Sequence, residues 1–155
     1  MTIGADSAIH FFGTQDTLGG TATAAVADAA FSTIHATTGL VAWTNDDDAP
    51  EASIISECNF SVAPDAGSTV SLMARKLNIV STNDQDVPDA NNPHTFLGFF
   101  PLNDVTTAQY IEIDIALPSG KTSAEYEFYV QNNSGQSMPA GWDMYITPRT
   151  IGPHA

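Results

Sequence analysis

Carboxylates are the side chains of this sequence that most invite a chemical role, and several of them stand in short runs. Asp46–Asp48 is one run, and Asp84, Asp86 and Asp89 form a second in a segment rich in Asn and Pro. Closely spaced carboxylates in a loop can converge on Ca²⁺, which takes six to eight oxygen ligands. The second run lacks the glycine and the distal glutamate of an EF-hand loop. We therefore treat its three aspartates as weak cation candidates and expect a solvated loop without a metal.

Motifs for nucleophilic, redox or zinc-dependent catalysis do not occur: Gly-x-Ser-x-Gly, Cys-x-x-Cys and His-Glu-x-x-His are all absent. Gly120-Lys121-Thr122 matches the end of a phosphate-binding loop, but Ile115 occupies the position of the leading glycine. The single cysteine, Cys58, alternates with strand residues, so we expect it to be buried and inert. These observations predict a protein without enzymatic activity and without a cofactor.

The charge balance is strongly acidic, with 18 Asp and Glu against 4 Lys and Arg and a formal net charge of −14 over 155 residues. No Lys or Arg precedes Arg75. Binding to nucleic acid draws on clustered basic side chains that neutralise phosphates, so we do not expect it here. Anionic membranes are disfavoured for the same reason. The amino terminus has neither the basic nor the apolar region of a secretory signal, and we expect no membrane-spanning segment.

The elements that must position these side chains are predicted from alternation of apolar and polar residues. The clearest case runs from Ala108 to Leu117, where Ile111, Ile113 and Ile115 alternate with polar neighbours, which predicts one buried and one wet face. The other runs expected to be extended are Ser7–Phe12, Thr21–Ser32, Gly39–Thr44, Ser53–Val62, Ser68–Val80, Thr95–Leu102, Tyr126–Val130 and Trp142–Ile146.

About eight strands at regular spacing predict an all-β fold: a single antiparallel β-sandwich, jelly-roll-like, spanning residues 1–155. We expect a short N-terminal arm (1–6) and, because of Pro148 and Pro153, an irregular C-terminal arm (147–155). The alternation of apolar and polar residues shifts by one position around Arg75-Lys76, which predicts a β-bulge there. Trp142 is expected in the core, and Tyr110 and Tyr129 on wet faces.

Two predicted hairpins, Cys58–Leu72 and the stretch from Pro101 through Ile111–Gly120 to Tyr126–Val130, carry a family resemblance. In order and composition these elements resemble the small jelly-roll cement, or decoration, proteins of tailed-bacteriophage capsids. The resemblance implies a non-enzymatic virion protein on the outer capsid surface that stabilises the shell through repeated contacts. Its implied partners are the major capsid protein and further copies of itself, as a homodimer or homotrimer. No catalytic residue is implied.

Contact with a partner is expected to use both arms and a small set of side chains. The scarce basic residues offer anchors, Trp43 lies beside a polar loop, and three consecutive aspartates repel one another unless solvent or a cationic partner surrounds them. The predicted partner-binding residues are Arg75, Lys76, Arg149, Trp43, Asp46, Asp47 and Asp48.

Three alternatives remain open. A phage tail or baseplate structural protein would have the same composition. A carbohydrate-binding β-sandwich module predicts exposed aromatic rings in a groove. A hydrolase predicts convergent carboxylates, for instance Asp86 with Glu112 or Asp114, although the spacing does not favour it.

Overall fold

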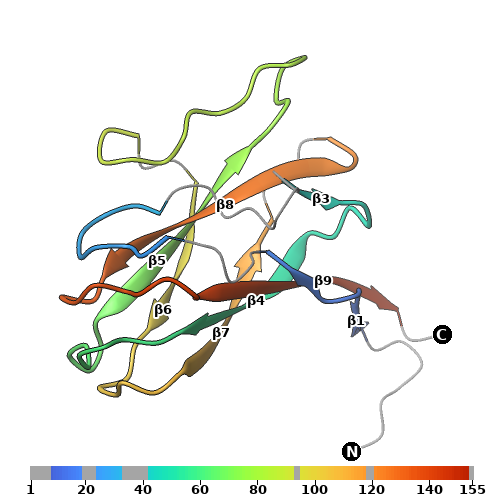
Figure 1. The fold of residues 1–155 in the computed structure, drawn as a ribbon. Coiled ribbons are helices and arrows are strands. Elements are labelled where there is room, and N and C mark those ends of the chain that lie inside the picture. The colour runs from blue at the N-terminus through green and yellow to red at the C-terminus, as the bar shows by residue number, and fades with distance from the viewer. Residues whose placement is uncertain (1–7, 19–23, 33–41, 93–94, 118–120, 154–155) are drawn as a thin grey trace, which may run out of the picture.

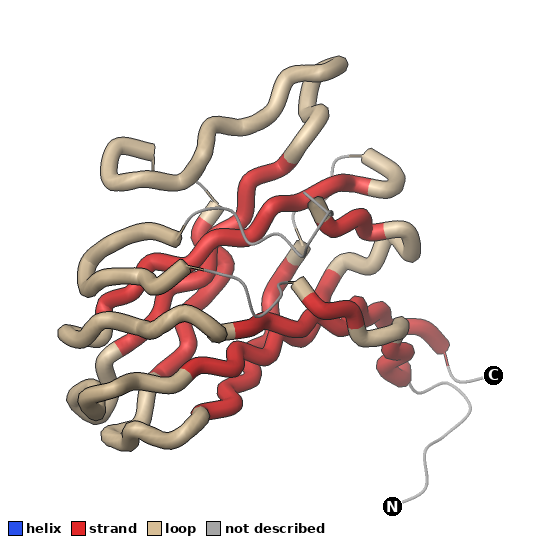
Figure 2. Tube along the Cα trace, in the orientation of Figure 1, coloured by secondary structure: helices blue, strands red, loops and turns tan. Residues whose placement is uncertain are grey.

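The chain contains strands and no helix in the part described by the computed structural model, residues 8–18, 24–32, 42–92, 95–117 and 121–153 (Figures 1 and 2). The predicted arm 1–6 and the first part of the expected run 39–44 lie outside these residues. In the described part of the chain, no helix is long and apolar enough to cross a membrane.

Two antiparallel sheets pack face to face, which confirms the predicted β-sandwich (Figure 1). The described residues form nine strands against the expected eight or so, and the shortest of these is two residues long. The five-stranded sheet has the order β1 (Ala8–Phe12), β9 (Asp143–Pro153), β4 (Glu51–Cys58) and β7 (Gln109–Ala116), with β2 (Asp16–Thr17) also pairing with β9. The four-stranded sheet has the order β3 (Trp43–Asn45), β8 (Ala124–Asn133), β5 (Thr69–Lys76) and β6 (Phe96–Pro101).

The core forms between the inner faces of the two sheets. Ile54 of β4 lies opposite Ile146 of β9, and neither side chain is exposed to solvent. Trp142, predicted for the core, is buried there. The predicted alternation on β7 is confirmed, because Ile115 is buried while Tyr110 and its even-numbered neighbours face outward. Burial of these apolar faces is the main force that holds the sheets together.

Strand β8 is buried on both faces, so the prediction that Tyr129 lies on a wet face is wrong. Tyr129 and Glu127 are almost completely buried, and the Tyr129 hydroxyl donates to Glu127 at 2.8 Å. Arg75 on β5 bonds both Glu127, at 3.2 Å, and Asp84, at 2.9 Å, in the segment after β5. That segment therefore folds back over the outer face of β5 and β8. Alternation alone cannot reveal such a cover.

The predicted bulge at Arg75-Lys76 is also wrong, because β5 ends at Lys76. Asn78 takes a positive φ of 51°, which ends the extended run before Ile79. The register shift lies instead between Leu72 and Met73, opposite β6. The apolar residues after Lys76 therefore belong to the following loop.

The predicted C-terminal arm (147–155) is regular strand as far as Pro153, which corrects the expectation of an irregular end. Strand β1 pairs with Arg149–Pro153, so hydrogen bonding to a neighbour extends β9 past both prolines. A proline fits a strand where its missing N–H is not needed, and the carbonyl of Pro148 still accepts from Gly13 at 2.8 Å. Among the residues expected to be extended at 21–32, those described make two isolated bridges, Val26 to Met138 and Phe31 to Gln131.

Candidate functional site

The outer face of the five-stranded sheet brings together polar and aromatic side chains from four strands. At one end, Phe12, Arg149 and Glu51 stand side by side on β1, β9 and β4. At the other end, Asp143, Glu57 and Tyr110 stand side by side on β9, β4 and β7. Arg149 lies six positions after Asp143 on β9, about 20 Å at the rise of a β-strand. We call them the Arg149 end and the Asp143 end.

At the Arg149 end, one guanidinium holds two carboxylates. Arg149 bonds Glu51 through Nε at 3.1 Å and Nη2 at 2.9 Å, and it reaches across β4 to Asp114, where Nη1 lies 3.0 Å from Oδ2. Hydrogen bonds to Asp114 and Glu51 raise the pKa of Arg149. Ser53 donates its hydroxyl to Glu112 beside this pair. The carboxylates here have partners within the chain.

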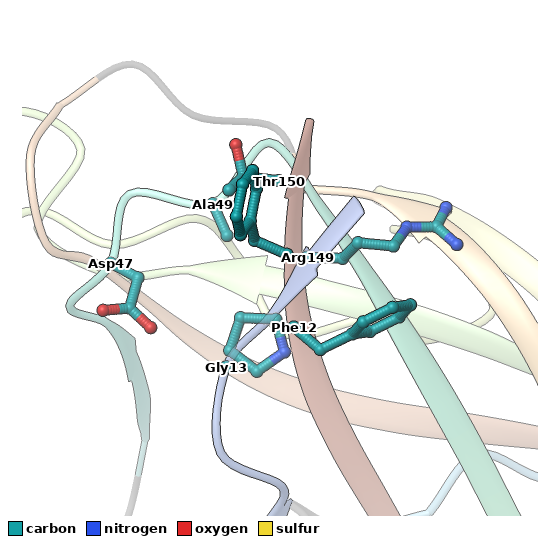
Figure 3. A pocket seen from close by; sticks show the side chains of 8 residues that line it. Phe12, Gly13, Asp47, Ala49, Arg149 and Thr150 are labelled. Atoms are coloured by element: carbon teal, nitrogen blue, oxygen red, sulfur yellow. The ribbon is translucent and has the colours of Figure 1, made fainter. Parts of the chain in front are cut away.

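The ring of Phe12 is 64% exposed at this end, although it belongs to a strand. Figure 3 shows the Phe12 and Arg149 side chains extending alongside each other. A pocket of about 390 Å³ opens on the outer face beside them and is lined by Phe12, Ser53, Glu112, Ile113, Asp114 and Arg149. A second hollow of about 310 Å³ shares two of these residues and is lined by Phe11, Phe12, Gly13, Asp47, Ala49, Pro148, Arg149 and Thr150 (Figure 3).

At the Asp143 end, two tyrosine hydroxyls donate to one carboxylate, while one oxygen of the neighbouring carboxylate has no donor among the described residues. Tyr110 donates to Oε1 of Glu57 at 2.8 Å, and Tyr145 donates to Oε2 at 3.0 Å. These bonds to Glu57 raise the pKa of both phenols. Oδ1 of Asp143 is buried and accepts no hydrogen bond from the described residues. Burial, and secondarily the charge of Glu57, raise the pKa of Asp143.

Two of the predicted metal candidates, Asp84 and Asp89, accept hydrogen bonds from nearby backbone N–H groups. Asp84 accepts from the Asn78 N–H at 2.9 Å and pairs with Arg75. Asp89 accepts from the N–H groups of Asn91 and Asn92. No group of three or more His, Cys, Asp or Glu that could hold a metal occurs in the described ranges, so Asp84, Asp86 and Asp89 do not come together as one.

Most of the predicted partner-binding residues make contacts within the chain. Arg75 bonds Asp84 and Glu127, and the Lys76 ammonium lies 6.0 Å from the centre of the Tyr126 ring. Trp43 donates to Asp16 at 3.0 Å.

The three consecutive aspartates are exposed in the turn after β3. Asp48 accepts from the Ser123 N–H at 2.7 Å, Asp47 lines the second hollow, and Asp46 precedes them. Their contact with a partner stays a prediction, as it does for Arg75, Lys76 and Trp43. Arg149 is the predicted residue that the fold places in the outer-face site.

Sequence reasoning missed Phe12, Ser53, Glu51, Glu57 and Asp143 as members of one surface. The sequence did carry one indication. On β4, the polar residues Glu51, Ser53 and Glu57 all lie at odd-numbered positions, so they share the outward face. By contrast, the predicted burial of Cys58 is confirmed, while its inertness stays a prediction. It is buried, and burial raises the pKa of its thiol to about 11, which leaves almost no reactive thiolate at neutral pH.

Comparison with known proteins assigns no family to the chain. No family model matches it, and no curated protein matches it. Among solved structures it is similar to "CBM35 from Cellvibrio japonicus Abf62", with a TM-score of 0.38 and 13% sequence identity over 96% of this chain and 99% of that chain. At this TM-score the similarity carries no argument about ligand or function.

Proposed function

We propose that this protein is a non-catalytic carbohydrate-binding β-sandwich whose ligand lies at the Arg149 end of the outer face. The observation that carries the proposal is the pocket of about 390 Å³, in which the exposed ring of Phe12 stands beside a guanidinium, a hydroxyl and carboxylates. This volume falls within the range of about 300–1,000 Å³ typical of small-molecule sites. An aromatic face packs against the C–H groups of a sugar ring, and the polar groups hydrogen-bond its hydroxyls.

The charges of the pocket select the kind of sugar. Arg149 is already balanced by Glu51 and Asp114, and Glu112 adds a further carboxylate to the lining. An anionic ligand would therefore meet net repulsion, since like charges at short range destabilise a complex. We expect a neutral glycan, with its hydroxyls donating to Glu112 and Asp114.

Calorimetric titration with neutral and acidic oligosaccharides identified on a glycan array tests this proposal. Phe12→Ala should weaken the binding of the neutral ligand about tenfold, the effect of losing roughly 1.4 kcal/mol of contact. Phe99→Ala is the matched control, because Phe99 is 52% exposed on the outer face of the other sheet. Absence of any neutral ligand, or equal losses in the two variants, would overturn the proposal.

A virion decoration role is the second candidate, and the ribbon formed by β1 and the end of β9 favours it. Phe11 and Ile151, about half exposed, lie on its two faces, and neither Ala8–Phe12 nor Arg149–Pro153 contains a carboxylate. In the described part of the chain, β1 is hydrogen-bonded on one side only, to β9. On a chain of net charge −14, this apolar edge is where another copy or a capsid protein would meet least repulsion.

Sedimentation equilibrium tests the ribbon as a contact between copies. The unmodified protein should form a dimer or trimer, and the double substitution Phe11→Ser, Ile151→Ser should return it to a monomer. Mass spectrometry of purified virions should then find hundreds of copies, the number expected of a shell component. A monomer at all concentrations, together with absence from virions, would remove this candidate.

A further inference from the structure

We propose that the Asp143 end of the outer face is a second binding site, which takes an ammonium or guanidinium cation. The site consists of Glu57, Asp143, Tyr110 and Tyr145. It does not depend on the carbohydrate proposal, because it shares no residue with the pocket at the Arg149 end.

The strand register brings the two carboxylates of the site together. Glu57 and Asp143 are directly opposed residues of neighbouring strands, so their side chains project from the same face at close range. Tyr110 opposes Glu57 from the other side, on β7. Tyr145 lies two residues after Asp143 on β9 and also points outward. Three strands thus converge on two carboxylates.

Among the described residues, one oxygen of Asp143 has no hydrogen-bond donor. This residue is only 9% exposed, yet its Oδ1 has no donor among the described residues. A buried acceptor without a donor is costly, and native proteins rarely leave one unsatisfied. The phenol O–H groups of Tyr110 and Tyr145 are both directed to Glu57, so neither serves Asp143. The described residues therefore leave part of the hydrogen-bonding capacity of Asp143 unmet.

The acceptors and the charge of the cluster indicate a cationic ligand. With its phenol protons already donated, the cluster offers acceptors and carries the charge of two carboxylates. A neutral sugar needs donors for its ring and hydroxyl oxygens, whereas an ammonium or guanidinium group is purely a donor and cationic. A divalent cation is disfavoured because Ca²⁺ requires six to eight oxygens, and no group of three metal-ligating residues occurs within the described residues.

The exposed Tyr110 ring adds a further attraction for a cation. It is 67% exposed beside Glu57, and a cation placed over the face of a tyrosine is attracted by its ring electrons. All four Lys and Arg side chains make contacts elsewhere. Arg149 bonds Glu51 and Asp114, and Arg75 bonds Asp84 and Glu127. The Lys76 ammonium lies 6.0 Å from the centre of the Tyr126 ring, and Lys121 donates to the Asn78 carbonyl. An ammonium or guanidinium group must therefore come from outside, either as a free amine or as a Lys or Arg side chain.

Titration of the ¹⁵N-labelled protein followed by NMR tests the proposal, with n-butylammonium, n-butylguanidinium and the peptide acetyl-Gly-Lys-Gly-amide as three separate probes. Saturable shifts should appear at the amides of Glu57, Tyr110, Asp143 and Tyr145. Asp143→Asn should weaken binding about tenfold, as expected for a charge-assisted hydrogen bond. Glu125→Gln makes the same change in net charge on β8 of the other sheet, where Glu125 accepts from the Asn78 side chain, and should leave binding unchanged.

The probes also distinguish the two sources of the cation. Tighter binding of the peptide assigns a protein side chain, and equal binding of the small cations assigns a free amine. Weak shifts spread over the whole acidic surface, equal losses in Asp143→Asn and Glu125→Gln, or no shifts at the four residues would overturn the proposal. Because Phe12→Ala leaves this site intact, loss of sugar binding and loss of cation binding are separable results.

Discussion

The two ends of the outer face hold carboxylates in opposite ways. At the Arg149 end, Glu51 and Asp114 share a guanidinium supplied by the chain itself. At the Asp143 end, Glu57 accepts two hydrogen bonds from tyrosine hydroxyls, and Oδ1 of Asp143 accepts none from the described residues. The same strands support both ends. The carboxylates at the Arg149 end thus have donors within the fold, whereas at the Asp143 end one carboxylate oxygen has none among the described residues.

Removing the guanidinium should produce the largest change in stability. Arg149→Gln leaves Glu51, Asp114 and Glu112 without a cation, so their mutual repulsion should lower the melting temperature by several degrees at neutral pH. Thermal unfolding measured by circular dichroism checks this. Lys121→Gln is the control, since Lys121 is exposed and its ammonium donates to the carbonyl of Asn78. Equal shifts in both variants would mean that the pairing is inconsequential.

Asp143→Asn should act in the opposite direction and raise the melting temperature by about 2 °C at neutral pH. Folding raises the pKa of Asp143 through burial and the nearby charge of Glu57, so the charged form is disfavoured in the folded state. The stability cost is therefore present above the folded pKa and disappears as the pH falls below the ordinary aspartate range. Melting curves measured from about pH 3 to about pH 7, a range that spans the usual pKa of aspartate, check this. A variant less stable than the parent at neutral pH would contradict it.

Glu57→Gln should lower the pKa of Tyr110 and Tyr145 toward the ordinary tyrosine range. Both phenols donate to Glu57, and this bond and the carboxylate charge hold their pKa values up. Ultraviolet absorbance of the phenolates, followed during an alkaline titration, measures the change. Tyr129 provides an internal reference, because burial first and Glu127 second raise its pKa to about 12, independently of Glu57. Unchanged titration of Tyr110 and Tyr145 would exclude the proposed contacts.

The smallest change is expected at Cys58, whose thiol should not react with a labelling reagent in the folded protein. Its thiol is buried on the inner face directly after Glu57, with a pKa of about 11. A thiol reagent should label it only after denaturation, in the parent and in Asp143→Asn alike. Rapid labelling under native conditions would indicate that the Asp143 end opens.

The strand pattern was predictable because each strand carries its own alternation, as Ile111, Ile113 and Ile115 do on β7. The site was not predictable in this way, because its contacts join residues that are far apart in sequence. Tyr145 meets Glu57 across 88 positions, and Arg149 meets Glu51 across 98. Spacing along one strand cannot show which residue lies opposite on the next. For this reason Arg149 was predicted as a contact residue, whereas Glu51 and Phe12 were not.

The most direct test of the account is NMR mapping of the ¹⁵N-labelled protein with a neutral oligosaccharide. If a neutral sugar binds at the Arg149 end, we expect saturable shifts at the amides around Phe12, Ser53, Asp114 and Arg149. These shifts should be lost in Phe12→Ala. Shifts confined to the outer face of the four-stranded sheet around Phe99, or none with any neutral glycan, would contradict it.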